Sequence, residues 1–188
     1  MGYRSNIYID GQNLHHSLQN VHKYNPRHFK KSYDSYSIDY DSFSKMFIKS
    51  DSILNEVKYY GAVYPVEFNQ DKHDKDKIFH ARLKNLYKID VRLGKFKRNP
   101  VREKGVDVLL ALDLVLDAID DKYDNAYVVS DDTDLIPAIE EISRRYGRGE
   151  KQKRIYQLTL RDKLLNEFKD TCYFCIKIGE DKIKKLIV

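Results

Sequence analysis

Short apolar segments alternate along this chain with segments whose apolar residues recur at helical spacing. The strand-like segments are residues 5–9, 56–66, 89–97, 125–130 and 155–160, followed by TCYFCIKI near the end. Helical spacing appears between them, as in Leu14, Leu18 and Val21, and again over residues 105–120. Strands that are apolar on both faces and joined through helices form parallel sheets with helices on each side. The sequence therefore predicts an α/β fold with a mostly parallel central sheet.

The length and composition predict one domain over residues 1–188. Hydrophobic residues make up 41% of the chain and charged residues 34%, which is enough apolar material for a buried core. Residues 27–38 are polar and rich in Tyr and Ser. We predict that this stretch is a surface insertion.

Neither a membrane span nor a secretion signal is evident in the sequence. The chain contains no run of about 18 apolar residues, and MGYRSNIYIDG lacks the long hydrophobic region of a signal peptide. We therefore predict a cytoplasmic protein with no membrane partner.

Cys172 and Cys175 fall in a strand-like segment, where alternation would send them to opposite faces as buried, reduced thiols.

Acidic side chains follow the ends of the predicted strands. Asp10 and Asn13 close the first strand in IYIDGQNL, and Asp107 begins a helix in KGVDVLLALDLV. The segment AYVVSDDTDLIPAI adds Asp131, Asp132 and Asp134. The carboxyl ends of parallel strands meet at one edge of a sheet, so these groups are expected to lie near one another. On the helix of residues 105–120, Asp107 is predicted to point inward, and Asp113, Asp117 and Asp120 outward.

Clustered carboxylates indicate a metal site. Several carboxylates in one place raise one another's pKa values unless a cation neutralises them. Mg²⁺ and Mn²⁺ prefer oxygen ligands, which makes Asp10, Asp107, Asp132 and Asp134 the predicted metal-binding and catalytic residues. Such ions generate a hydroxide nucleophile and stabilise the leaving oxygen in phosphodiester hydrolysis. The alternative is that each acid only caps a helix or a turn.

Basic residues flank these acidic motifs. The formal charge is only +5, but two clusters stand out: Lys95, Lys97, Arg98, Arg102 and Lys104, and then Arg144, Arg145, Arg148, Lys151, Lys153 and Arg154. Positive flanks around an acidic centre suit a phosphodiester substrate with metal ions. The predicted substrate contacts are Asn13, Lys104, Ser130, Lys95, Lys97 and Arg98. Ordinary solvated helix and loop surfaces are the alternative explanation for either cluster.

The three motif blocks IYIDGQNL, KGVDVLLALDLV and AYVVSDDTDLIPAI resemble those of NYN-domain proteins, the PIN-like nucleases often labelled LabA-like. Their order and spacing also match, and the resemblance covers about residues 5–178. It implies a Rossmann-like three-layer α/β/α sandwich of the PIN-like type and metal-dependent ribonuclease activity.

The family's acids fall on Asp10, Asp107, Asp132 and Asp134, and its amide on Asn13. One departure is Asp131, which stands where the family's last block commonly has Gly after its Ser. Alignment of that block favours Asp132 over Asp131 as the ligand.

The leading hypothesis is a Mg²⁺- or Mn²⁺-dependent ribonuclease that acts in a carboxylate-lined cleft. A non-catalytic RNA-binding or assembly module on a nuclease scaffold is the main alternative, and a phosphatase of small esters is a third. A dinucleotide-binding enzyme is disfavoured because DGQN stands where the G-x-G-x-x-G loop would follow the first strand. The sequence leaves homo-oligomerisation open.

Overall fold

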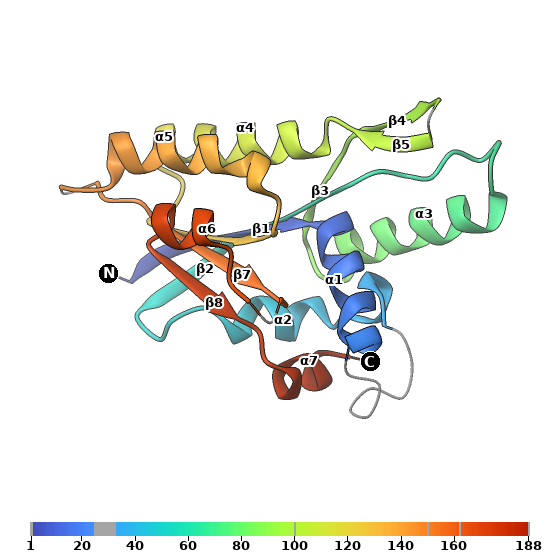
Figure 1. The fold of residues 1–188 in the computed structure, drawn as a ribbon, viewed down its shortest axis with the longest axis horizontal. Coiled ribbons are helices and arrows are strands. Elements are labelled where there is room, and N and C mark those ends of the chain that lie inside the picture. The colour runs from blue at the N-terminus through green and yellow to red at the C-terminus, as the bar shows by residue number, and fades with distance from the viewer. Residues whose placement is uncertain (1, 25–32, 100, 150, 162, 188) are drawn as a thin grey trace.

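The protein is a three-layer α/β/α sandwich in a computed structural model that describes residues 2–24, 33–99, 101–149, 151–161 and 163–187 (Figure 1). The central sheet consists of β1 (Tyr3–Asp10), β2 (Ser52–Gly61), β3 (Asp90–Leu93), β6 (Asn125–Val129), β7 (Arg154–Thr159) and β8 (Phe174–Lys177). The helices are α1 (Gly11–Tyr24), α2 (Tyr40–Met46), α3 (Gln70–Asn85), α4 (Val106–Ile119), α5 (Ile136–Tyr146), α6 (Asn166–Thr171) and α7 (Glu180–Leu186). Short 3₁₀ helices η1 (Ser35–Ser37) and η2 (Thr133–Leu135) complete this set.

The strands run in the order β3-β2-β1-β6-β7-β8, and every neighbouring pair is parallel. The predicted parallel sheet is thus confirmed. Chain order reverses between β1 and β6, which are hydrogen-bonded neighbours in the middle of the sheet. In open α/β sheets of this kind, ligands bind outside the carboxyl ends of the strands at such a reversal. This topology brings the end of β1 beside the end of β6.

Two hydrophobic cores cover the two faces of the sheet. Ile7 and Ile9 of β1 pack with residues of α1, α2, α3 and α7, whereas Tyr8 between them packs with residues of α4, α5 and α6. Side chains alternate between faces along a strand, so one continuous apolar segment serves both cores.

Within the described residues, no helix is both long enough and apolar enough to cross a bilayer.

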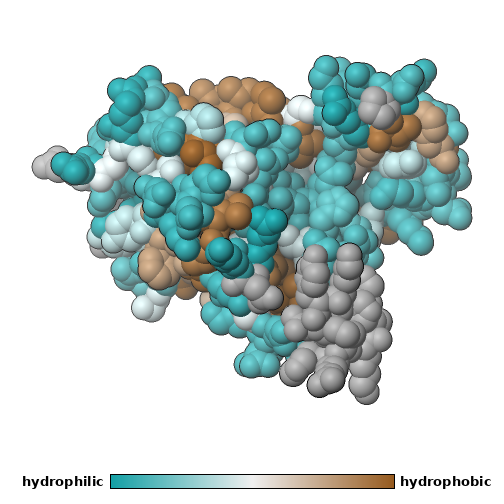
Figure 2. Space-filling model, viewed as in Figure 1, coloured by the Kyte–Doolittle hydropathy of each residue, from teal (hydrophilic) through white to brown (hydrophobic). Residues whose placement is uncertain are grey.

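The predicted strand over residues 89–97 is divided in the structure. β3 ends at Leu93, and the chain then leaves the sheet to form a separate antiparallel hairpin of β4 (Lys95–Arg98) and β5 (Val101–Lys104). Gly94 permits this departure, because a Cβ there would lie 2.7 Å from the Val106 side chain and 2.9 Å from the Lys104 carbonyl oxygen. The hairpin extends beyond the sheet (Figure 1), and its surface is largely hydrophilic (Figure 2).

The prediction that Asp113 and Asp117 face solvent is wrong. Asp117 is 2% exposed and accepts hydrogen bonds from Lys58 at 2.5 Å and from the Tyr8 hydroxyl at 2.8 Å. Asp113, 9% exposed, accepts from the Tyr60 hydroxyl at 2.9 Å. Polar groups on β1 and β2 therefore draw these acids toward the sheet. The outer face of α4 is apolar instead, and forms part of the hydrophobic upper edge in Figure 2.

The predicted surface insertion is only partly described, because residues 27–32 lie outside the described residues. Ser35 and Ile38 are buried, and the Tyr36 ring packs edge-on against Phe79 with ring centroids 4.8 Å apart. The surface prediction therefore fails at Ser35 and Ile38, whereas Tyr36 and Ser37 are partly exposed.

The two cysteines do not alternate along one strand. Cys172 ends α6 and Cys175 lies in β8, and both are half-buried free thiols packed against the same core. Their predicted separation on opposite faces is wrong because the strand begins only at Phe174. Burial raises the pKa of the Cys172 thiol to about 12, which keeps it protonated and unreactive.

Candidate metal centre

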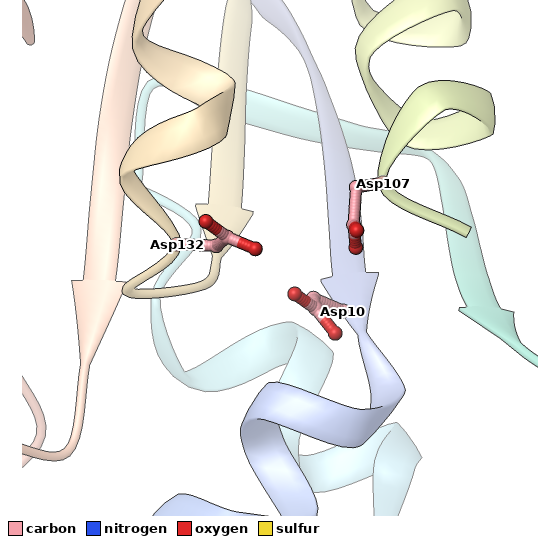
Figure 3. A group of neighbouring side chains, drawn as sticks. All are labelled: Asp10, Asp107 and Asp132. Atoms are coloured by element: carbon pink, nitrogen blue, oxygen red, sulfur yellow. The ribbon is translucent and has the colours of Figure 1, made fainter. Parts of the chain in front are cut away.

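Three carboxylates meet at the carboxyl end of the sheet, where the strand order reverses. Asp10 is the last residue of β1, Asp132 follows β6, and Asp107 lies in the first turn of α4. Each offers an oxygen, and these oxygens all lie within 4.8 Å of one another. Figure 3 shows the three side chains turned toward a common point from separate elements. The topology thus brings together acids that are far apart in the chain.

Asp10 is held rigidly at the floor of this cluster. Its side chain is 4% exposed and accepts hydrogen bonds from the Asn13 backbone N–H at 3.0 Å and the Ser130 hydroxyl at 2.9 Å. Burial raises the pKa of Asp10 to about 6, and the nearby charges of Asp107 and Asp132 act in the same direction. The two hydrogen bonds oppose that rise. Asp10 is therefore a carboxylate whose charge needs a positive partner.

Asp132 is positioned by the turn that follows β6. Its backbone N–H donates to the Ser130 hydroxyl at 3.1 Å, and its Oδ1 accepts from the Asp134 backbone N–H at 3.0 Å. The second contact makes Asp132 the N-cap of η2. Because Ser130 also binds Asp10, one hydroxyl fixes the spacing of two acids.

Asp107 enters the cluster from the opposite side. Gly105 precedes α4 with φ of +80°, a left-handed conformation that favours glycine and turns the chain sharply from β5 into the helix. Burial raises the pKa of Asp107, and the charges of Asp132 and Asp134 raise it further. A first-turn acid also complements the helix dipole, so the capping explanation and the metal-site explanation apply together.

The donor set fits a hard divalent cation. In the described part of the chain, no Lys or Arg forms an ion pair with Asp10, Asp107 or Asp132. Within the described residues, no cationic side chain therefore pairs with these acids to offset their mutual repulsion. Carboxylate oxygens from three elements are the ligand type that Mg²⁺ and Mn²⁺ take, with water completing the coordination.

Comparison with known proteins places this arrangement in a family. The model of the NYN domain matches residues 4–174, which include all three clustered acids. The chain belongs to the NYN family. NYN domains are part of the PIN-like nuclease superfamily, and the carboxylate cluster of this NYN domain fits a divalent-metal site.

A solved structure has the same fold as this NYN domain. It is the crystal structure of a protein of unknown function from Vibrio parahaemolyticus, with a TM-score of 0.70 and 19% sequence identity. The alignment covers 100% of this chain and 97% of that one. At this identity the likeness concerns the fold alone. No curated protein matched the chain.

The two remaining acids of the SDDTD segment lie outside the cluster of the NYN domain. Asp134 is exposed and donates its backbone N–H to Asp132, while its charge acts on Asp107 from a distance. Asp131 turns the other way, and its carboxylate accepts from the Gln157 side chain at 3.0 Å. Asp132 is therefore the acid of this pair that faces Asp10.

Ser130 and Asn13 have structural contacts where the sequence suggested contacts with substrate. Ser130 is 1% exposed, and its hydroxyl is engaged by Asp10 and by the backbone of Asp132. The Asn13 side-chain oxygen accepts from the Asp131 backbone N–H at 3.1 Å, which ties α1 to the loop after β6. Both residues position the acids, and the burial of Ser130 argues against its predicted contact with substrate.

The predicted phosphate contacts lie on the hairpin. Lys95 and Lys97 of β4 and Lys104 of β5 are exposed, and Lys104 precedes Gly105 and α4. Arg98 is also exposed but forms an ion pair with Glu67 at 3.4 Å. The exposed basic side chains of the hairpin therefore lie directly before the helix turn that carries Asp107.

The sequence analysis missed Glu103, which faces the site from β5. Burial raises the pKa of Glu103 to about 7, with a further contribution from the charge of Asp10. The signal that could have found it is the turn dipeptide Asn99–Pro100, which marks a hairpin rather than one long strand. Hairpin alternation then separates Phe96 and Glu103 from the lysines of the same strands.

Proposed function

We propose that this NYN domain hydrolyses RNA phosphodiester bonds in a reaction that depends on Mg²⁺ or Mn²⁺. The observation that carries the proposal is the convergence of Asp10, Asp107 and Asp132, whose oxygens lie within 4.8 Å of one another. When bound, the metal ion supplies a Lewis acid and an activated water for attack on phosphorus.

Different structural elements and hydrogen bonds position the three acids that would bind the metal ion. Asp10, Asp107 and Asp132 would hold the ion, each from a different element, so that the site depends on the packing of the whole sheet edge. Ser130 fixes Asp10 relative to Asp132, and Asn13 fixes the loop between them. Preorganised ligands of this kind favour binding because little conformational entropy is lost when the ion arrives.

The hairpin supports RNA as the substrate. Lys95 and Lys104 face each other across β4 and β5, so two positive charges occupy one face of the hairpin. Like charges directly opposite each other are unfavourable in a sheet unless an anion lies between or beside them. A phosphate backbone supplies those anions, and the lysines would guide it toward Asp107.

In the second basic cluster, over residues 144–154, several cationic side chains are already paired with acidic groups and are less available to bind RNA. Arg144 and Arg145 both pair with Glu141 on α5, and Lys153 is 4% exposed with its ammonium held by Asp121 and the Tyr123 carbonyl oxygen. The hairpin is thus the better candidate for the RNA track.

The test is cleavage of labelled single-stranded and structured RNA in Mn²⁺, Mg²⁺ or EDTA. We expect wild-type protein to cleave RNA only with metal, and Asp10→Asn and Asp107→Asn to lose more than about 100-fold in rate, because even residues that only orient metal ligands contribute roughly 10- to 100-fold. Asp120→Asn, at an exposed position at the far end of α4, is the matched control and should retain full rate.

The outcomes separate the hypotheses. Full activity in either ligand variant would contradict the proposed site. RNA binding by wild-type protein without any cleavage would favour a non-catalytic RNA-binding module. Hydrolysis of small phosphate esters but not of RNA would favour a phosphatase.

A further inference from the structure

A hollow of about 310 Å³ lies beside the carboxylate cluster. It is bounded by the start of α1, by η1, by α3 and by the β4–β5 hairpin, which lie together on one side of the molecule (Figure 1). Gly11, which lines the hollow, directly follows Asp10, and the pKa of Glu103 on its wall responds to the charges of Asp10 and Asp107. The hollow therefore adjoins the proposed metal site.

Aromatic rings line much of this hollow. The ring of Phe96 meets that of Tyr64 edge-to-face with centroids 5.3 Å apart, and Tyr36 lines the wall nearer α3. Asp76 holds this wall in place, because it accepts from the Tyr36 hydroxyl at 2.5 Å and from the backbone N–H of Tyr64 at 2.8 Å. Preset aromatic walls suit a flat ring, since stacking of a base on an aromatic side chain contributes about 1–3 kcal/mol.

Two buried polar atoms of the hollow have no hydrogen-bond partner among the described residues. They are Nδ1 of His80, a side chain only 7% exposed on α3, and Oε2 of Glu103 on the hairpin. Buried polar atoms nearly always have a partner, and leaving one unpaired costs roughly 1–3 kcal/mol. A ligand with matching groups would satisfy them.

Both strands of the hairpin contribute residues to the wall of the hollow. Phe96 and Glu103 are direct cross-strand partners, and both line the hollow. Lys95 pairs with Lys104, and Lys97 with Arg102, in the alternate register. Arg102, the cross-strand partner of Lys97, also lines the hollow, so an RNA strand bound along the basic side chains of the hairpin would reach this cavity with aromatic walls.

We propose that this hollow binds a guanine base of the RNA strand, with the Glu103 carboxylate accepting hydrogen bonds from the N1–H and N2–H groups and Phe96 or Tyr64 stacking on the ring. The substrate class rests on the proposed ribonuclease function. The volume is at the lower end of the roughly 300–1,000 Å³ typical of small-molecule sites, which suits one base.

The carboxylate selects guanine over the other bases. Guanine presents two adjacent N–H donors on its Watson–Crick edge, which match two carboxylate oxygens. Uracil flanks its single N–H with carbonyl oxygens that would repel the carboxylate, and adenine and cytosine each offer one amino group there. Donors from the bound base would also favour the ionised form of Glu103.

The test measures affinity without cleavage. Hexanucleotides of uridine that carry one central G, A, C or U are titrated by fluorescence anisotropy in EDTA against the full chain. A good bidentate contact discriminates between bases by about 1–3 kcal/mol, so we expect the G-containing strand to bind at least about tenfold more tightly than the others. Glu103→Gln should abolish that preference, and Phe96→Leu should weaken binding of all four strands.

Glu67→Gln provides the matched control, because Glu67 is exposed on the loop before α3, lies outside the hollow and undergoes the same chemical change. It should leave the preference for guanine unchanged. Equal binding of the four strands, a preference that survives Glu103→Gln, or tighter binding of free guanosine monophosphate than of the G-containing strand would overturn the proposal.

The result is independent of catalysis. A guanine preference in EDTA by a protein that never cleaves RNA with metal would keep the base site and reject the nuclease. Metal-dependent cleavage with equal binding of all four strands would support the nuclease and reject the guanine site.

Discussion

The Ser130 hydroxyl donates a hydrogen bond of 2.9 Å to Asp10, a residue 120 positions earlier in the chain. The same oxygen accepts the Asp132 backbone N–H at 3.1 Å. Because Asp10 ends β1 and Ser130 follows β6, this contact spans the two strands between which the chain order reverses. One buried hydroxyl thus sets the distance between two acids of the proposed metal site.

Removing that hydroxyl should weaken the metal site while keeping the ligands. We expect Ser130→Ala to raise the Mn²⁺ concentration needed for half-maximal RNA cleavage by roughly 10- to 100-fold, as is typical for residues that orient metal ligands. The measurement is cleavage rate against Mn²⁺ concentration. Thr133→Ala, at an exposed neighbouring position, should behave like wild-type protein. An unchanged Mn²⁺ requirement in Ser130→Ala would show that the hydroxyl does not support the site.

The stability of the metal-free protein should depend on pH through Asp10. Its pKa is about 6 in the folded protein against 3.8 ordinarily, so the folded state holds the proton more tightly. That contribution is complete below pH 3.8 and is lost as pH rises to about 6, with a magnitude of about 3 kcal/mol from a shift of roughly two pKa units. In EDTA, wild-type protein should therefore lose stability over this range.

Asp10→Asn is the comparison, because an amide carries no charge at any of these pH values. We expect the variant to be more stable than wild-type protein at pH 8 in EDTA, with a smaller difference at pH 4.5, by urea denaturation. Saturating Mn²⁺ should stabilise wild-type protein and not the variant. Parallel pH profiles of the two proteins would contradict the burial of a charged Asp10.

The hairpin should dominate RNA binding. We expect the triple change of Lys95, Lys97 and Lys104 to Gln to weaken RNA binding for all sequences and to reduce the salt dependence of log Kd by roughly 1 for each lost phosphate contact. Arg144→Gln with Arg145→Gln should have little effect, because both arginines already pair with Glu141. Anisotropy titrations over a range of salt concentrations measure both. The reverse ranking would place the RNA on α5.

The buried ion pair between Lys58 and Asp117 should contribute to the stability of the fold and not to RNA cleavage. Asp117→Ala leaves the Lys58 ammonium buried without its 2.5 Å partner, and we expect a loss of about 3–5 kcal/mol in the free energy of unfolding. Replacing both residues, as Lys58→Met with Asp117→Leu, should recover most of that loss. Chemical denaturation measures each variant, and Asp120→Ala is the exposed control. A loss below about 1 kcal/mol in Asp117→Ala would indicate that Glu56, 3.5 Å from the Lys58 ammonium, or water compensates for the missing carboxylate.

The meeting of Asp10, Asp107 and Asp132 was predictable because parallel strands end at a shared edge, and both strand-end motifs are visible in the sequence. Asp134 was grouped with them on sequence grounds alone. The 3₁₀ turn places it outside the cluster, and only the geometry of η2 separates it from Asp132.

The inward direction of Asp117 was not predictable from helical periodicity, which assigns acidic stripes to solvent. Its partner Lys58 stands between Val57 and Tyr59 in the apolar half of β2, and that charged residue was the available signal. The site residue Glu103 was missed for a related reason. One long strand was inferred over residues 89–97, so the alternation of the hairpin was never applied to Phe96 and Glu103.

The central claim is that Asp132, and not its neighbour, belongs to a catalytic metal site. Its most direct test is the Mn²⁺-dependent rate of RNA cleavage by Asp131→Asn and Asp132→Asn measured side by side. Asp131 faces Gln157 and Asp132 faces the cluster, so the same change is made at adjacent positions with opposite orientations. We predict a loss of more than about 100-fold for Asp132→Asn, since residues that only orient ligands already contribute roughly 10- to 100-fold, and a rate close to wild type for Asp131→Asn. Equal losses, or a larger loss for Asp131→Asn, would contradict the account.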